Sequence, residues 1–197
     1  MENFMKIIIA TQNQGKLKEF KEILQPLGYD VMSADEYGVN IDGIVETGTT
    51  FEENALIKVR YLYELTGVSV IADDSGLTID ALPDILGVYS ARYMGYDTAY
   101  SERNEHILNL LENESNRDAS FHCVIALKDD SGEYVFAGKC EGLIDASIGN
   151  EGFGYDPIFY PVGYDQSFAS MNSEEKNKIS HRGLALNLLV DHLKGDH

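Results

Sequence analysis

The chain has 197 residues, of which 44% are hydrophobic and 24% charged, a composition ordinary for one globular domain. Its formal net charge of −18 disfavours a duplex nucleic-acid binder, whose affinity depends on a basic surface. No apolar run approaches the roughly 20 residues of a membrane span, and the first residues lack the pattern of a signal peptide. Cys123 and Cys140 have no metal-ligand spacing, which favours a reduced pair in a cytoplasmic protein.

The chain opens with a predicted strand, turn and helix. Residues 6–10 are an apolar run typical of a buried strand, and the polar turn 11–16 follows. A helix then carries apolar side chains at spacings of three and four as far as Gly28. We expect free backbone N–H groups at its start to favour a phosphate, with Lys16 adding a positive charge. The alternative is a solvated lysine on an exposed face.

A second helix follows a loop that contains an acid. The capping-box pattern at residues 50–53 predicts a helix that ends near residue 65. Asn54 and Lys58 lie four residues apart and therefore share one of its faces. Asparagine is weakly disfavoured inside helices, which hints that the Asn54 amide has a role. Glu46, in the preceding loop, is either a surface acid or part of a site.

Two adjacent carboxylates, Asp73 and Asp74, follow the apolar run 68–72. We expect this run to be a buried strand that Gly76 ends with a turn, which places both acids at a sheet edge where ligands bind. Buried carboxylates are costly unless a cation neutralises them. A magnesium site needs one or two carboxylates plus phosphate oxygens. The pair is therefore a candidate metal and catalytic site.

The same tetrapeptide, Asp-Asp-Ser-Gly, recurs at residues 129–132. It separates two strand-like runs, 119–127 and 133–137, and is most simply a hairpin turn. The tetrapeptide alone therefore does not show whether a copy of it is part of a functional site. An antiparallel hairpin beside parallel strands predicts a mixed sheet.

Two further helices are expected in the second half of the chain. Ser101 can cap the first, and the last begins near Ser180 and carries an apolar stripe of Leu184, Leu188 and Leu189 or Val190. The fold class is therefore α/β.

Two polar segments of the second half are candidates for ligand binding. Three glycines within residues 149–154 allow close approach of a ligand, and Phe153 offers a ring to a planar base, although loop glycines also serve plain turns. Lys176, His181 and Arg182 gather positive charge in a very acidic chain. Cations in the first turn of a helix oppose its dipole, which indicates a bound anion or an electron-rich acceptor.

Together these segments resemble the house-cleaning nucleoside triphosphate pyrophosphatases that act on inosine and xanthosine triphosphates. The matching segments occur in family order and span nearly the whole chain. They are Ala10-Thr11-x-Asn13-x-Gly15-Lys16, Glu46-Thr47-Gly48-x-x-Phe51-x-x-Asn54-Ala55, Ala72-Asp73-Asp74-Ser75-Gly76-Leu77, Tyr89-Ser90-Ala91-Arg92-Tyr93, Phe153-Gly154-Tyr155-Asp156-Pro157-Ile158-Phe159 and Ser180-His181-Arg182-Gly183.

The resemblance implies a single domain over residues 1–197, with a mixed, strongly twisted sheet, flanking helices and two lobes around a deep cleft. It implies hydrolysis of ITP, dITP and XTP to the monophosphate and pyrophosphate with Mg²⁺, by a cytoplasmic homodimer. The partner is then a small nucleoside triphosphate, with no nucleic acid and no membrane. Two alternatives remain open: a pyrophosphatase of the septum-inhibitor type acting on modified pyrimidine nucleotides, and a nucleotide-binding sensor without turnover.

The resemblance also implies roles for individual residues. Asp74 matches the general base, and Lys16 and Lys58 match catalytic, phosphate-holding lysines. The metal ligands would be Asp74, Asp73 and Glu46, although Val45 stands where many relatives have another acid. The implied substrate-binding residues are Thr11, Asn13, Gly15, Lys16, Asn54, Ser75, Phe153, Gly154, Tyr155, Asp156, Lys176, His181 and Arg182.

Overall fold

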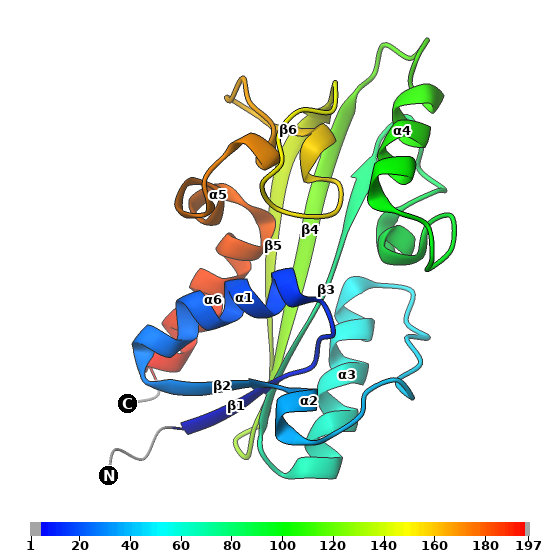
Figure 1. Cartoon of the computed structure of the whole chain (residues 1–197). Coiled ribbons are helices and arrows are strands. Elements are labelled where there is room, and N and C mark those ends of the chain that lie inside the picture. The colour runs from blue at the N-terminus through cyan, green and yellow to red at the C-terminus, as the bar shows by residue number, and fades with distance from the viewer. Residues whose placement is uncertain (1–4, 196–197) are drawn as a thin grey trace. The chain divides into compact units, whose positions relative to one another are not determined.

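A computed structural model describes residues 5–195 of the chain (Figure 1). Its strands are β1 (Met5–Ile9), β2 (Tyr29–Ser33), β3 (Ser69–Ile79), β4 (Asp118–Lys128), β5 (Glu133–Ile144) and β6 (Phe159–Pro161). Its α-helices are α1 (Gln14–Leu24), α2 (Ala34–Tyr37), α3 (Phe51–Thr66), α4 (Tyr100–Leu110), α5 (Ser173–Ile179) and α6 (His181–Gly195). Single 3-10 turns are η1 (Gln25–Leu27), η2 (Gly87–Arg92), η3 (Asp156–Ile158) and η4 (Phe168–Ser170).

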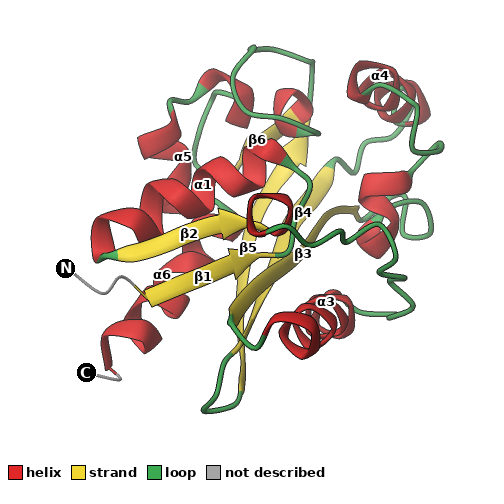
Figure 2. Ribbon diagram, turned by 60° about the horizontal axis from the view of Figure 1, so that its bottom comes forward, coloured by secondary structure: helices red, strands yellow, loops and turns green. Residues whose placement is uncertain are grey.

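The six strands form one mixed sheet in the order β2-β1-β3-β4-β5-β6. β1 pairs in parallel with both β2 and β3, whereas β6 pairs antiparallel with β5 (Figure 2). The predicted α/β class and mixed sheet are therefore confirmed. Strand β2 was not predicted from the sequence.

The chain divides into two compact units. The first unit comprises Met1–Asp74, Val124–Ala137 and Ala185–His197, and the second comprises Ser75–Cys123 and Gly138–Leu184. In the first unit, α3 buries Ala55, Val59 and Leu62 in a cluster with strand residues such as Ile8 and Val70. These three residues stand four and three positions apart and therefore share one face of the helix, and their burial fixes α3 beside β3.

The second unit has its own core, which is rich in aromatic rings. Phe121 of β4 lies 4.7 Å from Phe159 and 5.9 Å from Phe168, measured between ring centroids. Ile107 of α4 is fully buried in the same cluster. The core thus joins α4 to the strands and to the loops between residues 149 and 171.

The predicted ends of α3 are confirmed, whereas α1 begins at Gln14, inside the stretch predicted to be the turn 11–16. Asn13 caps α1, and Gly28 adopts a left-handed conformation after η1. Thr50 and Glu53 form the predicted capping box of α3, which ends at Gly67. These helix ends depend on local hydrogen bonds, which is why the sequence pattern locates them.

Three local predictions were wrong. Gly76 does not end β3, which continues to Ile79. Ser101 does not cap α4, because the helix begins at Tyr100 and its N-cap Ala99 accepts no side-chain hydrogen bond. On α6, Leu184 and Leu188 are exposed, so these two predicted core positions were wrong, whereas Leu189 is buried as predicted. None of the helices within residues 5–195 has the length and apolar character needed to cross a membrane.

Candidate active site

Asp73 and Asp74 lie inside β3 and not at its end. β3 pairs with β1 only as far as Ile71, opposite Ile9, and Ala10 N then donates to Ile71 O at 2.8 Å. The two acids therefore follow the carboxyl end of β1 while their own strand continues. Asp73 is 1% exposed and Asp74 is 7% exposed. Two buried carboxylates at such a strand end require positive charge nearby.

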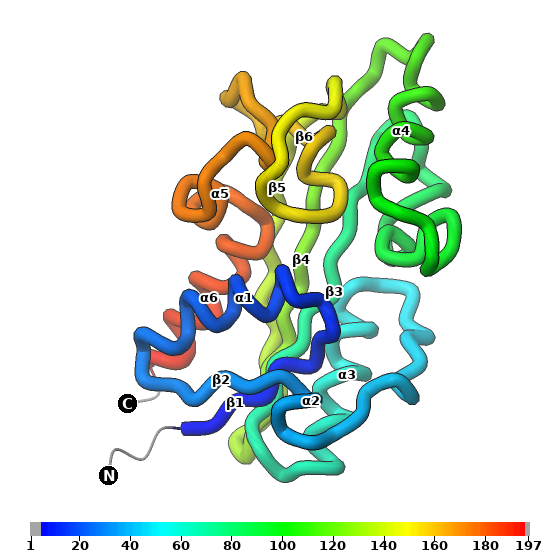
Figure 3. The backbone as a smooth tube through the Cα atoms, in the orientation of Figure 1, coloured from blue at the N-terminus to red at the C-terminus, as the bar shows by residue number. Residues whose placement is uncertain are grey.

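Lys16 of α1 supplies the first positive charge. Its Nζ lies 2.9 Å from Asp73 Oδ2. Figure 3 traces the chain from β1 through residues 10–13 into α1, the short path that brings Lys16 to this position. The side chain keeps some access to solvent, so the ammonium can also reach a bound anion.

The backbone N–H groups at the start of α1 are less available than predicted. Asn13 Oδ1 accepts from Gly15 N at 2.9 Å and from Lys16 N at 3.1 Å. Thr11 Oγ1 in turn accepts from Asn13 N at 3.1 Å. The expectation of free N–H groups at Gly15 and Lys16 was therefore wrong, because the cap residue satisfies both of them.

Lys58 of α3 supplies the second positive charge. Its Nζ lies 2.9 Å from Glu46 Oε1 and donates to the backbone oxygen of Asp73 at 2.6 Å. Burial disfavours the ammonium, but the carboxylates of Asp74 and Glu46 outweigh this effect and raise the pKa of Lys58. Lys58 therefore stays charged and connects the 44–50 loop to β3.

Asn54, one turn before Lys58, makes a second connection between the same two segments. Its Nδ2 donates to Asp74 Oδ2 at 3.0 Å, and its Oδ1 accepts from Gly48 N at 2.8 Å. A Cβ atom at position 48 would lie 2.6 Å from Asn54 Oδ1, so only glycine permits this approach. The hint from helix propensity that the Asn54 amide has a role is thereby explained.

The charges in this cluster suit a cation with oxygen ligands. Burial raises the pKa of Asp74, and the nearby charge of Glu46 adds to the rise, although Lys58 and Asn54 oppose it. The three carboxylates of Glu46, Asp73 and Asp74 carry one more formal charge than the ammonium groups of Lys16 and Lys58 balance. Within residues 5–195, no three His, Cys, Asp or Glu side chains form a ready-made metal cage. Mg²⁺ needs no such cage, because it takes one or two carboxylates plus phosphate oxygens and water.

A second group of predicted residues lies in the second unit, around the loop of residues 152–156. Asp156 Oδ2 accepts from Phe153 N and from Lys176 Nζ, both at 2.8 Å. Gly152 has φ +72°, and any Cβ atom there would collide with the Asp156 carboxylate. The buried Lys176–Asp156 ion pair thus fixes the loop that presents Phe153.

Two cations lie over the Phe153 ring. Lys176 Nζ is 5.0 Å and Arg182 Cζ is 5.5 Å from its centroid. Arg182 Nη2 also donates to Ser75 Oγ at 3.1 Å. Phe153, Lys176 and Arg182 therefore form one group of an aromatic ring and hydrogen-bond donors, as a site for a planar, oxygen-bearing ring requires.

His181 opens α6, and its imidazole ring stacks on Phe121 of β4. The two centroids are 4.5 Å apart and the rings are inclined by 8°. Phe121 was not among the predicted site residues. In the sequence it shows only as a core position of an alternating strand, and no local signal indicates which ring it contacts.

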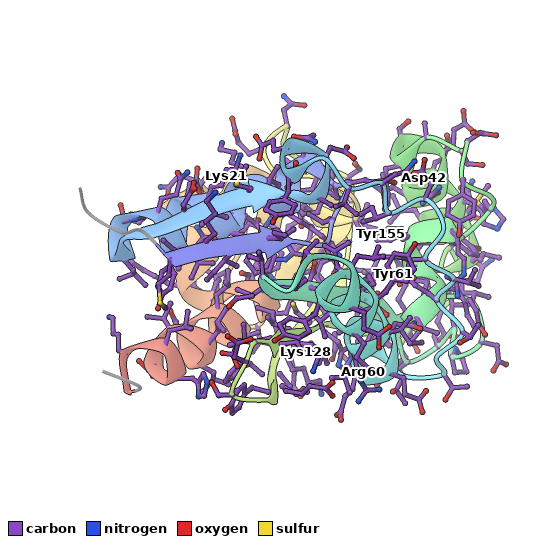
Figure 4. All side chains as sticks on the ribbon, turned by 90° about the horizontal axis from the view of Figure 1, so that it is seen from below. Lys21, Asp42, Arg60, Tyr61, Lys128 and Tyr155 are labelled. Carbon is purple, nitrogen blue, oxygen red and sulfur yellow. The ribbon has the colours of Figure 1, made fainter. Side chains whose placement is uncertain are left out.

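The second Asp-Asp-Ser-Gly segment is the predicted hairpin turn. Asp129 N donates to Gly132 O at 3.1 Å, and Asp129 Oδ1 accepts from Ser131 N at 2.8 Å. Asp130 accepts from the Tyr63 hydroxyl. Nearby, Glu133 pairs with Arg60 and Lys128, which are labelled side by side in Figure 4. This copy is anchored to α3 by surface contacts.

The structure distributes the predicted site residues over both units. The first unit holds Thr11, Asn13, Gly15, Lys16, Glu46, Asn54, Lys58, Asp73 and Asp74. The second holds Ser75, Phe153, Gly154, Tyr155, Asp156, Lys176, His181 and Arg182. The acids and two lysines thus gather in one unit, and the aromatic loop with three further cationic or imidazole side chains gathers in the other.

Comparison with known sequences identifies relatives over almost the full length. The sequence model of the Ham1 family matches residues 7–192. The dITP/XTP pyrophosphatase of Clostridium perfringens is 47% identical, over 96% of this chain and 98% of that protein. That of Yersinia pseudotuberculosis is 44% identical, again over 96% of this chain and 98% of the relative.

Solved structures show the same fold. A HAM1 protein from Coxiella burnetii matches with a TM-score of 0.87 and 43% identity, covering 98% of this chain and all (100%) of that one. The Ham1 protein of Staphylococcus aureus matches with a TM-score of 0.85 and 40% identity over the same shares.

Proposed function

The chain belongs to the Ham1 family, and on this premise we propose that it hydrolyses non-standard purine nucleoside triphosphates. Its substrates are ITP, dITP and XTP, and its products are the nucleoside monophosphate and pyrophosphate. The activity removes deaminated purines from the nucleotide pool. Relatives named dITP/XTP pyrophosphatases match nearly the whole chain at 44–47% identity, which supports this function over the pyrimidine and sensor alternatives.

One observation carries the proposal: two lysines and three carboxylates are held together in the first unit, with Asp74 at their centre. Lys16 pairs with Asp73, and Lys58 pairs with Glu46. A triphosphate brings about four negative charges and therefore needs such cations in a chain of net charge −18. We assign Lys16 and Lys58 to the phosphates.

Asp74 is the general base of the proposed reaction. Its carboxylate takes a proton from water as the water oxygen bonds to the α phosphorus. The bond between that phosphorus and the α–β bridging oxygen breaks, and pyrophosphate leaves with the electron pair. The hydrogen bond from Asn54 holds one carboxylate oxygen and thereby orients the other.

Asp73, Asp74 and Glu46 are the residues that would hold Mg²⁺. When bound, the ion supplies positive charge to the phosphate oxygens and lowers the barrier to attack by water. The one excess carboxylate charge of the cluster and the burial of Asp73 and Asp74 favour such an ion. Because the Val45 side chain has no group that can bind a metal, Glu46 is the acid that the 44–50 loop contributes.

We assign recognition of the base to the second unit. Phe153 stacks on the purine, and Arg182 and His181 donate to its 6-oxo group. Adenine has an amino group at that position, which would leave these donors without a partner, and such mismatches discriminate strongly. Lys176 acts through Asp156, because its ammonium is committed to that carboxylate at 2.8 Å.

The remaining assignments are also proposals. Both units make up one pyrophosphatase domain, which acts as a cytoplasmic homodimer without nucleic-acid or membrane partners. Cys123 and Cys140 are buried and form no disulfide with each other, in keeping with a reducing compartment. We further assign the substrate contacts to Thr11, Asn13, Gly15, Asn54, Ser75, Gly154, Tyr155 and Asp156. The molar mass in solution, measured by light scattering, tests the proposed homodimer.

Phosphorus-31 NMR of ITP turnover tests the proposed reaction. We expect IMP and pyrophosphate to form one to one, and chelation of divalent ions to stop the reaction. Orthophosphate and IDP as first products would instead mean attack at the γ phosphorus. That result would contradict the assignment of Asp74.

A further inference from the structure

Arg103 of α4 is a buried cation with an unusual set of partners. Its side chain is only 2% exposed. Its partners include two backbone carbonyls, the Tyr100 ring and the Tyr155 phenol, where a buried guanidinium usually faces a carboxylate. Burying a charged side chain without an opposite charge beside it is costly. General stability therefore does not account for an arginine here.

The guanidinium fastens both ends of one turn. Nη1 donates to Ala91 O at 2.9 Å, and Nη2 donates to Gly95 O at 2.7 Å. Between these two carbonyls, Met94 has φ +63°, a conformation that side chains other than glycine rarely adopt. A strained turn persists only where its surroundings hold it, and the planar fork of Arg103 holds both sides at once.

The same turn is connected to the loop proposed to recognise the base. The Tyr155 hydroxyl donates at 2.6 Å to the backbone oxygen of Ser90, the residue that precedes Ala91. The Tyr100 ring lies under the Arg103 guanidinium at 4.6 Å and meets the Tyr155 ring edge-on at 5.2 Å. Moving the guanidinium thus disturbs Tyr155 both through the turn and through Tyr100.

A neighbouring side chain of α4 contacts the loop as well. Asn104 Nδ2 donates to Gly154 O at 3.2 Å. Burial raises the pKa of Tyr155, and the positive charge of Arg103 opposes part of this rise. The first turns of α4 therefore hold residues 154 and 155 from two directions.

We propose that Arg103 is a positioning residue for base selection, which fixes the 91–95 turn and the Tyr100 ring against the Gly154–Tyr155 segment. This inference rests on the proposed function, since base selection is assigned to that segment. Arg103 itself contacts no substrate. Its effect on activity is transmitted by the position of Tyr155 and, through the loop, of Phe153.

Arg103→Lys is the decisive variant, because a single ammonium keeps the charge but cannot hold two carbonyls as a planar fork does. We expect the KM for ITP to rise by about tenfold with a smaller change in kcat, and the ITP/ATP ratio of kcat/KM to fall by a similar factor. Arg117→Lys is the matched control, since Arg117 lies in the same unit and its Nε donates to Glu114 O near the surface, away from the 91–95 turn. Ile107→Val in α4 controls for loss of stability alone.

Hydrogen–deuterium exchange tests the connection without relying on turnover. In Arg103→Lys, peptides covering residues 87–95 and 150–158 should both exchange faster, whereas Arg117→Lys should leave both unchanged. Faster exchange confined to residues 87–95, or an unchanged ITP/ATP ratio, would overturn the proposal. Failure of the wild-type enzyme to release pyrophosphate from ITP would instead reject the proposed function, and exchange would still decide whether Arg103 positions the loop.

Discussion

The amide of Asn54 joins the proposed base to the loop that carries Glu46. Nδ2 donates to Asp74 Oδ2 at 3.0 Å while Oδ1 accepts from Gly48 N at 2.8 Å, and the side chain is fully buried. Both polar ends of the amide are thus used within the protein. Among the residues assigned to substrate, Asn54 therefore has the strongest structural reason to act by positioning Asp74.

The two ends of this amide can be separated by mutation. Asn54→Asp keeps an oxygen for Gly48 N but loses the donor to Asp74, whereas Asn54→Ala loses both. We expect kcat to fall by at least about tenfold in both variants, with KM for ITP changed less than about threefold. Val59→Ala, on the buried stripe of the same helix, serves as the control for stability.

Limited proteolysis separates these variants without an activity assay. Cleavage after Glu46 by a glutamate-specific protease should accelerate in Asn54→Ala, because the 44–50 loop loses its anchor, and should change less in Asn54→Asp. A rise in KM with kcat intact in both variants would instead show that Asn54 binds the substrate directly.

Asp74→Asn should abolish turnover without weakening the fold. Burial raises the pKa of Asp74, so the protonated form is favoured in the folded state and the charged form costs stability. That cost grows as pH rises through the raised pKa and is absent below the ordinary pKa of aspartate. We therefore expect the melting temperature of Asp74→Asn to equal or exceed that of the wild type at pH 8, and the difference to shrink at acidic pH.

Asp130→Asn is the matched control for this variant, because Asp130 occupies the equivalent position in the second Asp-Asp-Ser-Gly segment. It should keep full activity, since Asp130 accepts from the Tyr63 hydroxyl at the hairpin surface and lies outside the acid and lysine cluster. A comparable loss of turnover in Asp130→Asn would contradict the distinction between the two copies. So would a loss of turnover of only threefold or less in Asp74→Asn.

Base selection should depend on Arg182. The wild-type enzyme should prefer ITP or XTP to ATP by at least about a hundredfold in kcat/KM. Arg182→Ala removes a donor that lies over Phe153 and contacts Ser75. We therefore expect ITP hydrolysis to slow and the ITP/ATP ratio of kcat/KM to fall. Arg117→Ala should change neither quantity. Equal hydrolysis of ATP and ITP by the wild type would reject the assignment of the purine pocket.

The sequence predicts those features of the fold that depend on neighbouring residues. The capping box of Thr50 and Glu53, the stripe of α3 and the 129–132 hairpin are all encoded within a few positions. The course of β3 past Gly76 was missed because glycine is also tolerated inside a strand. The backbone N–H groups at the start of α1 were expected to be free, yet the Asn13 side chain accepts from two of them.

Contacts between distant segments carry no comparable signal. Phe121 and His181 are 60 positions apart along the printed sequence, and neither residue type specifies the other as a stacking partner. Arg103 likewise looks like an ordinary helix charge, since its two carbonyl partners belong to a turn without a sequence signature. Such contacts depend on tertiary packing, which overrides local preference.

The Lys176–Asp156 pair should be far more important for stability than an exposed pair in the same helix. Its two side chains are 7% and 4% exposed, and its ions are 2.8 Å apart. Lys178 and Glu174 are also 2.8 Å apart but are 68% and 83% exposed. Removing one partner of a buried pair leaves an uncompensated charge, which costs about 3–5 kcal/mol. An exposed helix pair contributes about 0.3–0.5 kcal/mol.

Urea unfolding of Asp156→Ala and Glu174→Ala compares the two pairs directly. We expect the first to lose about 3 kcal/mol or more of unfolding free energy and the second less than about 1 kcal/mol. In the double variant Asp156→Ala/Lys176→Met, the stranded charge is gone, so part of the loss should be recovered. The KM for ITP should be raised in Asp156→Ala and should stay raised in the double variant, because Phe153 N has lost its acceptor in both. Recovery of both stability and KM would mean that the ion pair does not position the loop.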